Sequence, residues 1–140
     1  MTTRRSLLAT LTLLPTPARP DEALQAAIRA AIGDAEPTDG AIDIRLPAIA
    51  ENGAQVPLTI LVDSPMTPED HITTIHVFAT ANPTPGIASF HLTPALARAE
   101  IQTRIRVAEA QSIIVLARHN TGQIHRATAR LAVTRGGCLS

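Results

Sequence analysis

The residue best suited to covalent chemistry in this 140-residue chain is its only cysteine, Cys138, within the ending VTRGGCLS. Gly136 and Gly137 precede it, and glycine permits almost any backbone conformation. The four residues after the last predicted strand span about 13 Å when extended, and the nearby Arg135 favours the thiolate. A lone cysteine cannot form an internal disulfide. Three interpretations therefore stay open: a covalent arm that enters another protein's active site, an interchain disulfide, or no role.

No other group of residues resembles a catalytic or metal-binding set. His71 and His76 are an odd number of residues apart on one predicted strand, so they face opposite sides of it. The pair Glu69-Asp70 is typical of a solvated turn. The remaining histidines fall on different elements without ligand spacing: His91, His119 and His125. No P-loop, dinucleotide-binding or nucleophile-elbow motif occurs.

These absences predict that the chain has no metal, no cofactor and no catalytic set of its own. A cysteine-dependent peroxidase or transferase would require a base and an oxyanion donor beside the thiolate, and a terminal tail offers neither.

The amino-acid composition limits the classes of ligand and partner that the chain is expected to bind. The 12 basic residues are balanced by 12 acidic ones, whereas a nucleic-acid binder carries an excess of positive charge. Aromatic residues are limited to Phe78 and Phe90, so the core must consist of aliphatic side chains and few residues can stack on bases or sugars. No apolar run after the N-terminus is long enough to span a membrane. The length suits one compact domain.

Residues 1–20, MTTRRSLLATLTLLPTPARP, have the pattern of an export signal. Arg4-Arg5 precedes a short apolar stretch that ends in small residues and prolines, and adjacent arginines followed by Ser6-Leu7-Leu8 resemble a twin-arginine signal. An ordinary secretory signal or a disordered basic start is the alternative interpretation. Export by the twin-arginine route would bring the mature protein, folded, to the periplasm of a Gram-negative bacterium.

Residues 21–40 are predicted to form a helix and a linker. In DEALQAAIRAAIG, Asp21 can cap a helix of about three turns and Gly33 occupies the position of a left-handed stop. Leu24, Ile28 and Ile32 recur every four residues and form one apolar stripe. Pro37 and Gly40 lie in the linker.

From residue 41 the apolar period changes from that of a helix to the two-residue period of strands. AIDIRLP and AEIQTRIRVAEA alternate apolar and polar residues, and QSIIVLAR is the continuous apolar run expected of a central strand. The Asn52-Gly53 pair favours a tight hairpin before VPLTILVD. About seven short strands separated by turns predict an antiparallel, immunoglobulin-like β-sandwich over residues 41–134, followed by a flexible tail over residues 135–140.

Several segments together resemble the SoxY family, the sulfur-carrying subunit of the SoxYZ complex of periplasmic thiosulfate oxidation. They are NGAQVP, DSPMTPED, FATANPTP, FHLTP, TRIRVAEAQ and the terminal GGC. The resemblance covers essentially all of the chain after residue 20. It implies an immunoglobulin-like sandwich and a carrier function, in which Cys138 forms an S–S bond to thiosulfate and Gly136 and Gly137 form the flexible arm.

The resemblance also implies a set of partners. A SoxZ-like subunit would form a heterodimer or heterotetramer with this chain, and we expect the apolar face of residues 101–107 to help bind it. Transient partners would be a haem-containing oxidase, a hydrolase that releases sulfate and a sulfur dehydrogenase.

One departure from the family concerns the tail, which reads Gly-Gly-Cys-Leu-Ser where the family has Gly-Gly-Cys-Gly-Gly, so Leu139 and Ser140 replace two expected glycines. The alternative function is a non-carrier periplasmic adaptor whose cysteine links two chains.

Overall fold

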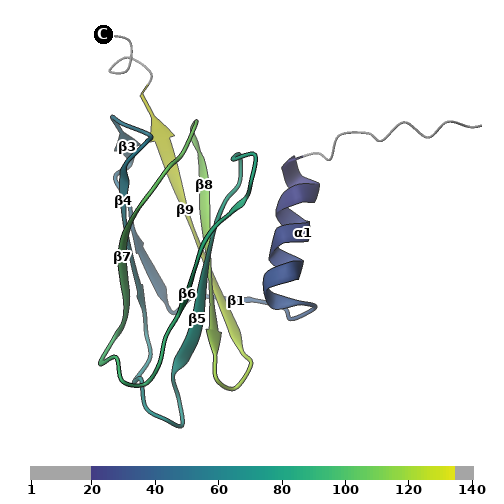
Figure 1. The fold of residues 1–140 in the computed structure, drawn as a ribbon, viewed down its shortest axis with the longest axis vertical. Helices are drawn as coiled ribbons and strands as arrows, with labels where there is room; N and C mark the ends of the chain where they lie inside the picture. Colours follow the sequence, from purple (N-terminus) through teal and green to yellow (C-terminus); the bar gives the residue numbers. More distant parts are fainter. Residues whose placement is uncertain (1–19, 135–140) are drawn as a thin grey trace, which may run out of the picture.

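The computed structural model describes residues 20–134, which form one helix and nine strands arranged as a β-sandwich (Figure 1). The helix is α1 (Pro20–Ile32). Three short strands follow: β1 (Thr38–Asp39), β2 (Ile42–Arg45) and β3 (Ile49–Ala50). Longer strands make up the rest: β4 (Val56–Val62), β5 (Ile72–Ala79), β6 (Gly86–His91), β7 (Ala99–Ile105), β8 (Gln111–His119) and β9 (Ile124–Val133). The predicted fold class, a sandwich with an N-terminal helix, is confirmed.

The strands form two sheets of unequal size. The larger has the order β1-β9-β8-β5-β6, with β3 also paired to β9, and the smaller has the order β2-β4-β7. The run QSIIVLARH of β8 lies in the middle of the larger sheet, between β9 and β5, as its continuous apolar pattern predicts. β6 and β7 are edge strands, because in the described part of the chain each pairs with one neighbour only.

The main core fills the space between the two sheets and is almost entirely aliphatic. On β4 the pattern alternates strictly, since Val56, Leu58, Ile60 and Val62 are buried while the residues between them are not. Their partners across the sandwich come from the inward faces of β5 and β8: Ile72, Ile75, Val77, Ile113, Val115 and Ala117. The two-residue period found in the sequence therefore corresponds to this two-sided environment.

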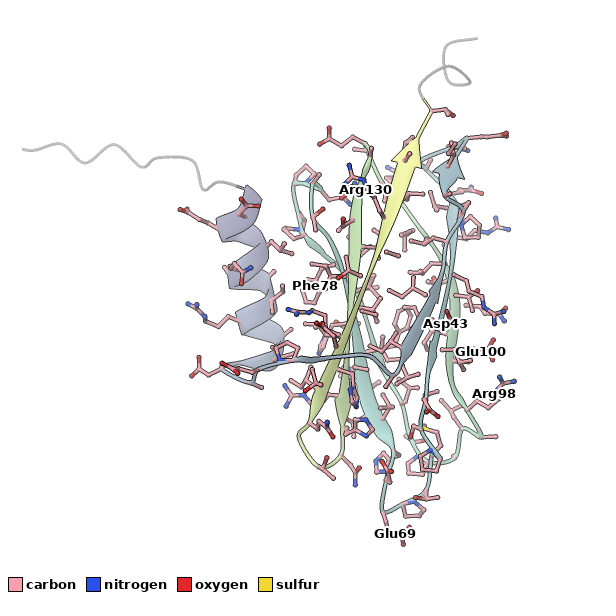
Figure 2. The ribbon with its side chains drawn as sticks, turned by 180° about the vertical axis from the view of Figure 1, so that it is seen from behind. Asp43, Glu69, Phe78, Arg98, Glu100 and Arg130 are labelled. Carbon is pink, nitrogen blue, oxygen red and sulfur yellow. The ribbon has the colours of Figure 1, made fainter. Side chains whose placement is uncertain are left out.

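A second, smaller cluster lies between α1 and the outer face of the larger sheet. Leu24 and Ile32 are buried and Ile28 is half-buried there, so the predicted stripe faces the sheet. They pack on three side chains of β5, β8 and β9: Phe78, Leu116 and Ile124. Figure 2 shows Phe78 on the side of the sheet that faces the helix.

Helix α1 ends where the sequence predicted, but it does not begin there. Gly33 has a φ of 67° and its N–H donates to the Arg29 carbonyl at 2.8 Å, which is the predicted left-handed stop. The helix starts at Pro20, however, so Asp21 lies inside the first turn and is not the cap. A proline is well suited to a first turn because its missing N–H has no helical partner there. No helix among residues 20–134 has the length and apolarity required to cross a bilayer.

The chain between α1 and β4 covers the free edge of β9, and this is where the structure departs from a wholly antiparallel arrangement. β1 and β3 each pair with β9 in parallel, at His125–Arg126 and at Ala132–Val133. Between them β2 joins the other sheet, antiparallel to β4. The segment predicted as a linker thus contributes the short strand β1, and sequence periodicity cannot detect strands of two residues.

The predicted tight hairpin at Asn52-Gly53 is wrong. The strands on either side of this turn lie in different sheets, because β3 pairs with β9 whereas β4 pairs with β2 and β7. Asn52 instead makes a local turn in which its Oδ1 accepts a hydrogen bond from the Ala54 N–H at 3.0 Å. Gly53 is needed for a close approach of two backbones, which is described below.

Candidate functional site at the end of β9

Cys138, Gly136 and Gly137 lie outside the described residues, so the structure defines the site through the place where β9 delivers them. The backbone is held up to its last described residue, since the Thr134 N–H donates to the Ala50 carbonyl at 3.0 Å. Figure 1 shows β9 ending beside β3, at one end of the sandwich. Cys138 is the fourth residue after Thr134, and four extended residues reach about 13 Å.

Two loops pack against the end of β9 through Gly53. A Cβ added to this buried glycine would collide with the carbonyl oxygen of Val107 and would lie 3.4 Å from Cγ1 of Val133. The Val107 N–H also donates to the Gly53 carbonyl at 2.8 Å. The loop after β3, the loop after β7 and the end of β9 are therefore in direct contact, and only glycine allows this spacing.

A buried amide network ties the β5–β6 loop to the β7–β8 loop at the same end. The Gln111 side chain is only 3% exposed, and its Oε1 accepts the Ala81 N–H at 2.8 Å. Its Nε2 donates to Asn82 Oδ1 at 2.9 Å, and Asn82 Nδ2 in turn donates to the Arg106 carbonyl at 3.1 Å. Every polar atom of Gln111 is thereby satisfied without water, which makes the geometry of these loops rigid.

The motif residues of the sequence gather around this end. Gly53 belongs to NGAQVP and Asn82 to the ATANP portion of FATANPTP, whereas Arg106 and Gln111 belong to TRIRVAEAQ. These segments are distant in sequence but are joined by the contacts just described. Sequence reasoning identified the motifs through family resemblance, but no spacing rule could show that they meet where β9 ends.

The motif DSPMTPED, by contrast, lies at the opposite end of the sandwich. Figure 2 shows Glu69 of this loop far from the end of β9. Thr67 and Asp70 close the turn with reciprocal backbone hydrogen bonds of 2.9 and 3.2 Å, as expected for a solvated turn. Near it, His71 Nδ1 contacts the Thr67 carbonyl at 3.0 Å, whereas His76 contacts the Ser89 hydroxyl at 2.8 Å, so these two histidines share no site.

His119 and His125 are brought together, a contact that sequence reasoning missed. Their rings meet edge to face with centroids 4.8 Å apart, and His119 Nδ1 lies 3.3 Å from Asp70 Oδ1. The signal was available: the Asn120-Thr121-Gly122 turn makes β8 and β9 a hairpin, in which His125 pairs with Ala117 and becomes a diagonal neighbour of His119.

Two histidines differ from the free residue in their affinity for protons. Burial lowers the pKa of His125, and the neighbouring His119 lowers it further. Burial also lowers the pKa of His76, with smaller contributions from the Arg118 guanidinium and from His91. Both changes favour the neutral ring. Among residues 20–134 no three histidine, cysteine or acidic side chains meet in an arrangement that could hold a metal ion.

The expected partner-binding face of residues 101–107 requires a correction. Ile105 and Val107 are buried in the core, and Ile101 packs against it from β7. This face is apolar because it points into the sandwich. What β7 leaves accessible is its outward polar side, with Gln102 and Arg104, and its unpaired edge.

Comparison with known proteins identifies one family. The model of the family described as "Sulfur oxidation protein SoxY" matches residues 28–138, a range that includes Cys138. The solved structure of the sulfur carrier protein SoxY from Chlorobium limicola f thiosulfatophilum is 34% identical over 81% of this chain and 98% of that chain, with a TM-score of 0.68. A search of curated protein sequences found no match.

More distant structures share the fold alone. A superoxide reductase (neelaredoxin) from Ignicoccus hospitalis is 12% identical over 68% of this chain and 81% of that chain, with a TM-score of 0.60. A putative superoxide reductase from Thermotoga maritima is 18% identical over 71% of this chain and 89% of that chain, with a TM-score of 0.59. At this level of identity the likeness carries no functional conclusion.

Proposed function

The chain belongs to the SoxY family of sulfur oxidation proteins, and on that premise we propose that it carries sulfur intermediates covalently on Cys138 and presents them to partner enzymes. The observation that carries this proposal is that the family match runs to Cys138, the only thiol of the chain. The anchored end of β9 supports it, because a rigid body and a short arm with two glycines suit delivery of a substrate to several enzymes in turn.

The proposed chemistry takes place on the sulfur of Cys138. Loading joins the thiolate to thiosulfate as Cys–S–S–SO₃⁻, and the two electrons released must go to an oxidase, for which a haem-containing partner is suited. Hydrolysis then consumes one water and releases sulfate and two protons, which leaves the persulfide Cys–S–S⁻. A sulfur dehydrogenase would oxidise the sulfane sulfur that remains. This chain supplies the attachment point and its position, and the partners supply the catalysis.

We extend the proposal to assembly and location. A SoxZ-like subunit is the expected stable partner, in a heterodimer or heterotetramer. The Arg4-Arg5 pair supports export by the twin-arginine route to the periplasm. Replacing both arginines by lysine should retain the protein in the cytoplasm, as measured by cell fractionation, whereas unchanged export would contradict this part of the proposal.

Intact-mass spectrometry tests the carrier function directly. The chain is incubated with thiosulfate, its partner subunit and the haem-containing oxidase. We expect a mass increase equal to one thiosulfate, which a reductant removes and which Cys138→Ser abolishes. A chain that gains no adduct and forms only a disulfide-linked dimer would instead be an adaptor, and the carrier proposal would be wrong.

A further inference from the structure

A groove open to solvent lies between α1 and the edge strand β6, on the outer face of the larger sheet. It has a volume of about 560 Å³. Within the described part of the chain β6 pairs only with β5, so the other edge of this strand is free. The lining of the groove is mostly apolar and consists of Ala27, Ala30 and Ala31 of α1, residues 84–89, and His76 and Phe78 of β5.

The polar end of the groove is formed by His76 and Ser89. The two residues are partners in the β5–β6 register, and His76 Nδ1 lies 2.8 Å from the Ser89 hydroxyl oxygen. The other ring nitrogen, Nε2, makes no hydrogen bond among residues 20–134 and is accessible to solvent. When the ring is protonated, this Nε2–H can donate to an incoming oxygen atom.

Two more basic side chains come to the same place from the neighbouring strands. Thr74 pairs with His91 on β6 and with Arg118 on β8. His76 lies two residues further along β5, on the same face as Thr74, so it has His91 and Arg118 as diagonal neighbours on its two sides. Burial lowers the pKa of His76 most, and the charges of Arg118 and His91 lower it further, which places both within electrostatic range of the ring.

The basic cluster of His76, His91 and Arg118 has no acidic counterpart. None of the three has a carboxylate within 4.0 Å among residues 20–134. Arg118 Nη2 donates to the Ala31 carbonyl at 3.3 Å, which offsets the negative end of the α1 dipole and leaves the other guanidinium donors available. α1 contributes only alanines to the groove, because Arg29 lies in a different cavity against β8 and β9.

Positive charge beside an apolar wall suits a small anion that has both oxygen atoms and a softer end. Arginine and protonated imidazole bind sulfonate oxygens through charge-assisted hydrogen bonds. The Phe78 ring offers no hydrogen bond to an oxygen, but polarisable sulfur packs favourably against an aromatic ring.

We propose that this groove binds thiosulfate without a covalent bond, with the oxygens on the basic cluster and the terminal sulfur against Phe78. Thiosulfate is the anion of this chemistry that the proposed function supplies. The site itself goes beyond that function, because it lies on the outer face of the larger sheet and does not use Cys138.

Nuclear magnetic resonance of the histidine rings tests the site. The full-length chain with Cys138→Ser, which cannot form an adduct, is titrated with sodium thiosulfate near pH 6, with sodium chloride keeping the ionic strength constant. We expect the ring resonances of His76 and His91 to shift saturably, while those of His119 and His125 stay unchanged. Near pH 8 the binding should be about tenfold weaker, because imidazole rings are then mostly neutral.

A parallel titration with sulfate tests the apolar half of the site. Sulfate has an oxygen where thiosulfate has its terminal sulfur, and this oxygen would face the Phe78 ring without a hydrogen bond. We therefore expect sulfate to bind about two- to tenfold more weakly than thiosulfate, which is the size of one sulfur–aromatic contact.

Variants decide which residues are responsible. Arg118→Gln and His76→Gln should each weaken thiosulfate binding by about two- to fivefold, the size of an exposed charge contact. Arg130→Gln is their control, because Arg130 is an exposed arginine of β9 outside the groove lining. Ala30→Glu adds a carboxylate to the groove and should abolish binding, whereas Ala26→Glu, exposed on the same helix outside the lining, should leave it nearly unchanged.

Three results would each overturn the inference. Ring resonances that respond to thiosulfate no more than to chloride would mean that the groove binds no oxyanion. Equal affinity for sulfate and thiosulfate would exclude the contact between the terminal sulfur and Phe78. Equal losses in Ala30→Glu and Ala26→Glu would assign the binding to net charge alone. The carrier function is tested separately, through adduct formation on Cys138, so none of these results contradicts it.

Discussion

Gly53 lies where three segments of the chain meet at the end of β9, and its lack of a side chain is what allows them to meet. We expect Gly53→Ala to lower the free energy of unfolding by about 1–3 kcal/mol, because the added methyl would push against the backbone carbonyl of Val107. Urea unfolding measures the effect. The control is Gly86→Ala, whose Cβ would meet only the Phe78 ring at 3.8 Å. Equal losses in the two variants would contradict this account.

His125 is expected to make stability depend on pH. Its pKa is lower in the folded chain than the ordinary value near 6.5, through burial and the nearby His119, so the unfolded chain binds the proton more readily. The contribution of His125 to stability is therefore complete above about pH 6.5 and is lost as the pH falls through the interval between the two pKa values. His125→Asn should flatten the decline of the urea midpoint between neutral and mildly acidic pH, although the unchanged His76 contributes in the same direction.

The histidine prediction has a clear contrary outcome. If the variant and the parent lose stability in parallel as the pH falls, His125 does not differ in pKa between the folded and unfolded chain. His76→Asn provides the comparison, because burial lowers its pKa in a separate place next to Ser89.

Leu139 and Ser140 form the other residue-scale question, because the family has glycines there. We expect the double change Leu139→Gly and Ser140→Gly to leave chemical loading of Cys138 by tetrathionate unchanged. In that reaction the thiolate attacks an inner sulfur of tetrathionate, Cys–S–S–SO₃⁻ forms, and thiosulfate leaves with the electron pair. With the chain's own partner enzymes, thiosulfate turnover should change by no more than about fivefold, because the thiol and the two glycines before it are unaltered. Turnover by the reconstituted system measures this. A much larger gain would show that the native tail is impaired with that enzyme set.

At the scale of elements, α1 is attached to the sandwich through a cluster of its own. Leu24, Ile28 and Ile32 contact only the outer face of the larger sheet, while the main core lies on the sheet's other side. A helix of 13 residues has little stability in water without such packing. The helix should therefore separate from the sandwich without unfolding it.

The change Leu24→Asp tests this independence. Burying a leucine contributes about 1.5–3 kcal/mol, so we expect α1 amides to lose roughly tenfold or more of their exchange protection while β8 amides retain theirs. Ala26→Asp is the matched control, since Ala26 is exposed on the same helix. Loss of protection throughout β8 would show that α1 and the sandwich unfold as one unit.

At the scale of the whole molecule, the proposed carrier consists of a rigid sandwich and an arm of defined length. Deleting Gly136 and Gly137 shortens the reach by about 7 Å, and replacing both by alanine keeps the reach but restricts the backbone. We expect both variants to be loaded by tetrathionate as readily as the parent. Turnover with partner enzymes should fall more for the deletion, because Cys138 would no longer reach deep into a partner's channel.

Comparison of the two tail variants separates the effect of the arm's length from the effect of glycine's backbone freedom. Equal rates for the deletion and the parent would mean that the arm does not need its length. Equal losses in the deletion and the double alanine variant would instead assign the requirement to the backbone freedom of glycine.

The amino-acid sequence by itself determined the features that depend on local pattern. Alternation along AIDIRLP and AEIQTRIRVAEA predicted strands with one apolar face, and that face packs on the core. The four-residue spacing of Leu24, Ile28 and Ile32 predicted a helix with one apolar stripe, and Gly33 marked its end. These predictions succeed because side-chain period follows directly from backbone geometry. Cys138 was identified in the same way, because a single thiol needs no tertiary information to be recognised.

Only the tertiary structure decided which distant segments meet. It placed Asn52-Gly53 between two sheets instead of in a hairpin, turned the apolar face of β7 into the core, and brought Asn82, Arg106 and Gln111 to the end of β9. It also opened the groove between α1 and β6. Such contacts depend on strand order and on the distribution of strands between sheets, which are settled by the packing of the whole core and leave no periodic trace in the sequence.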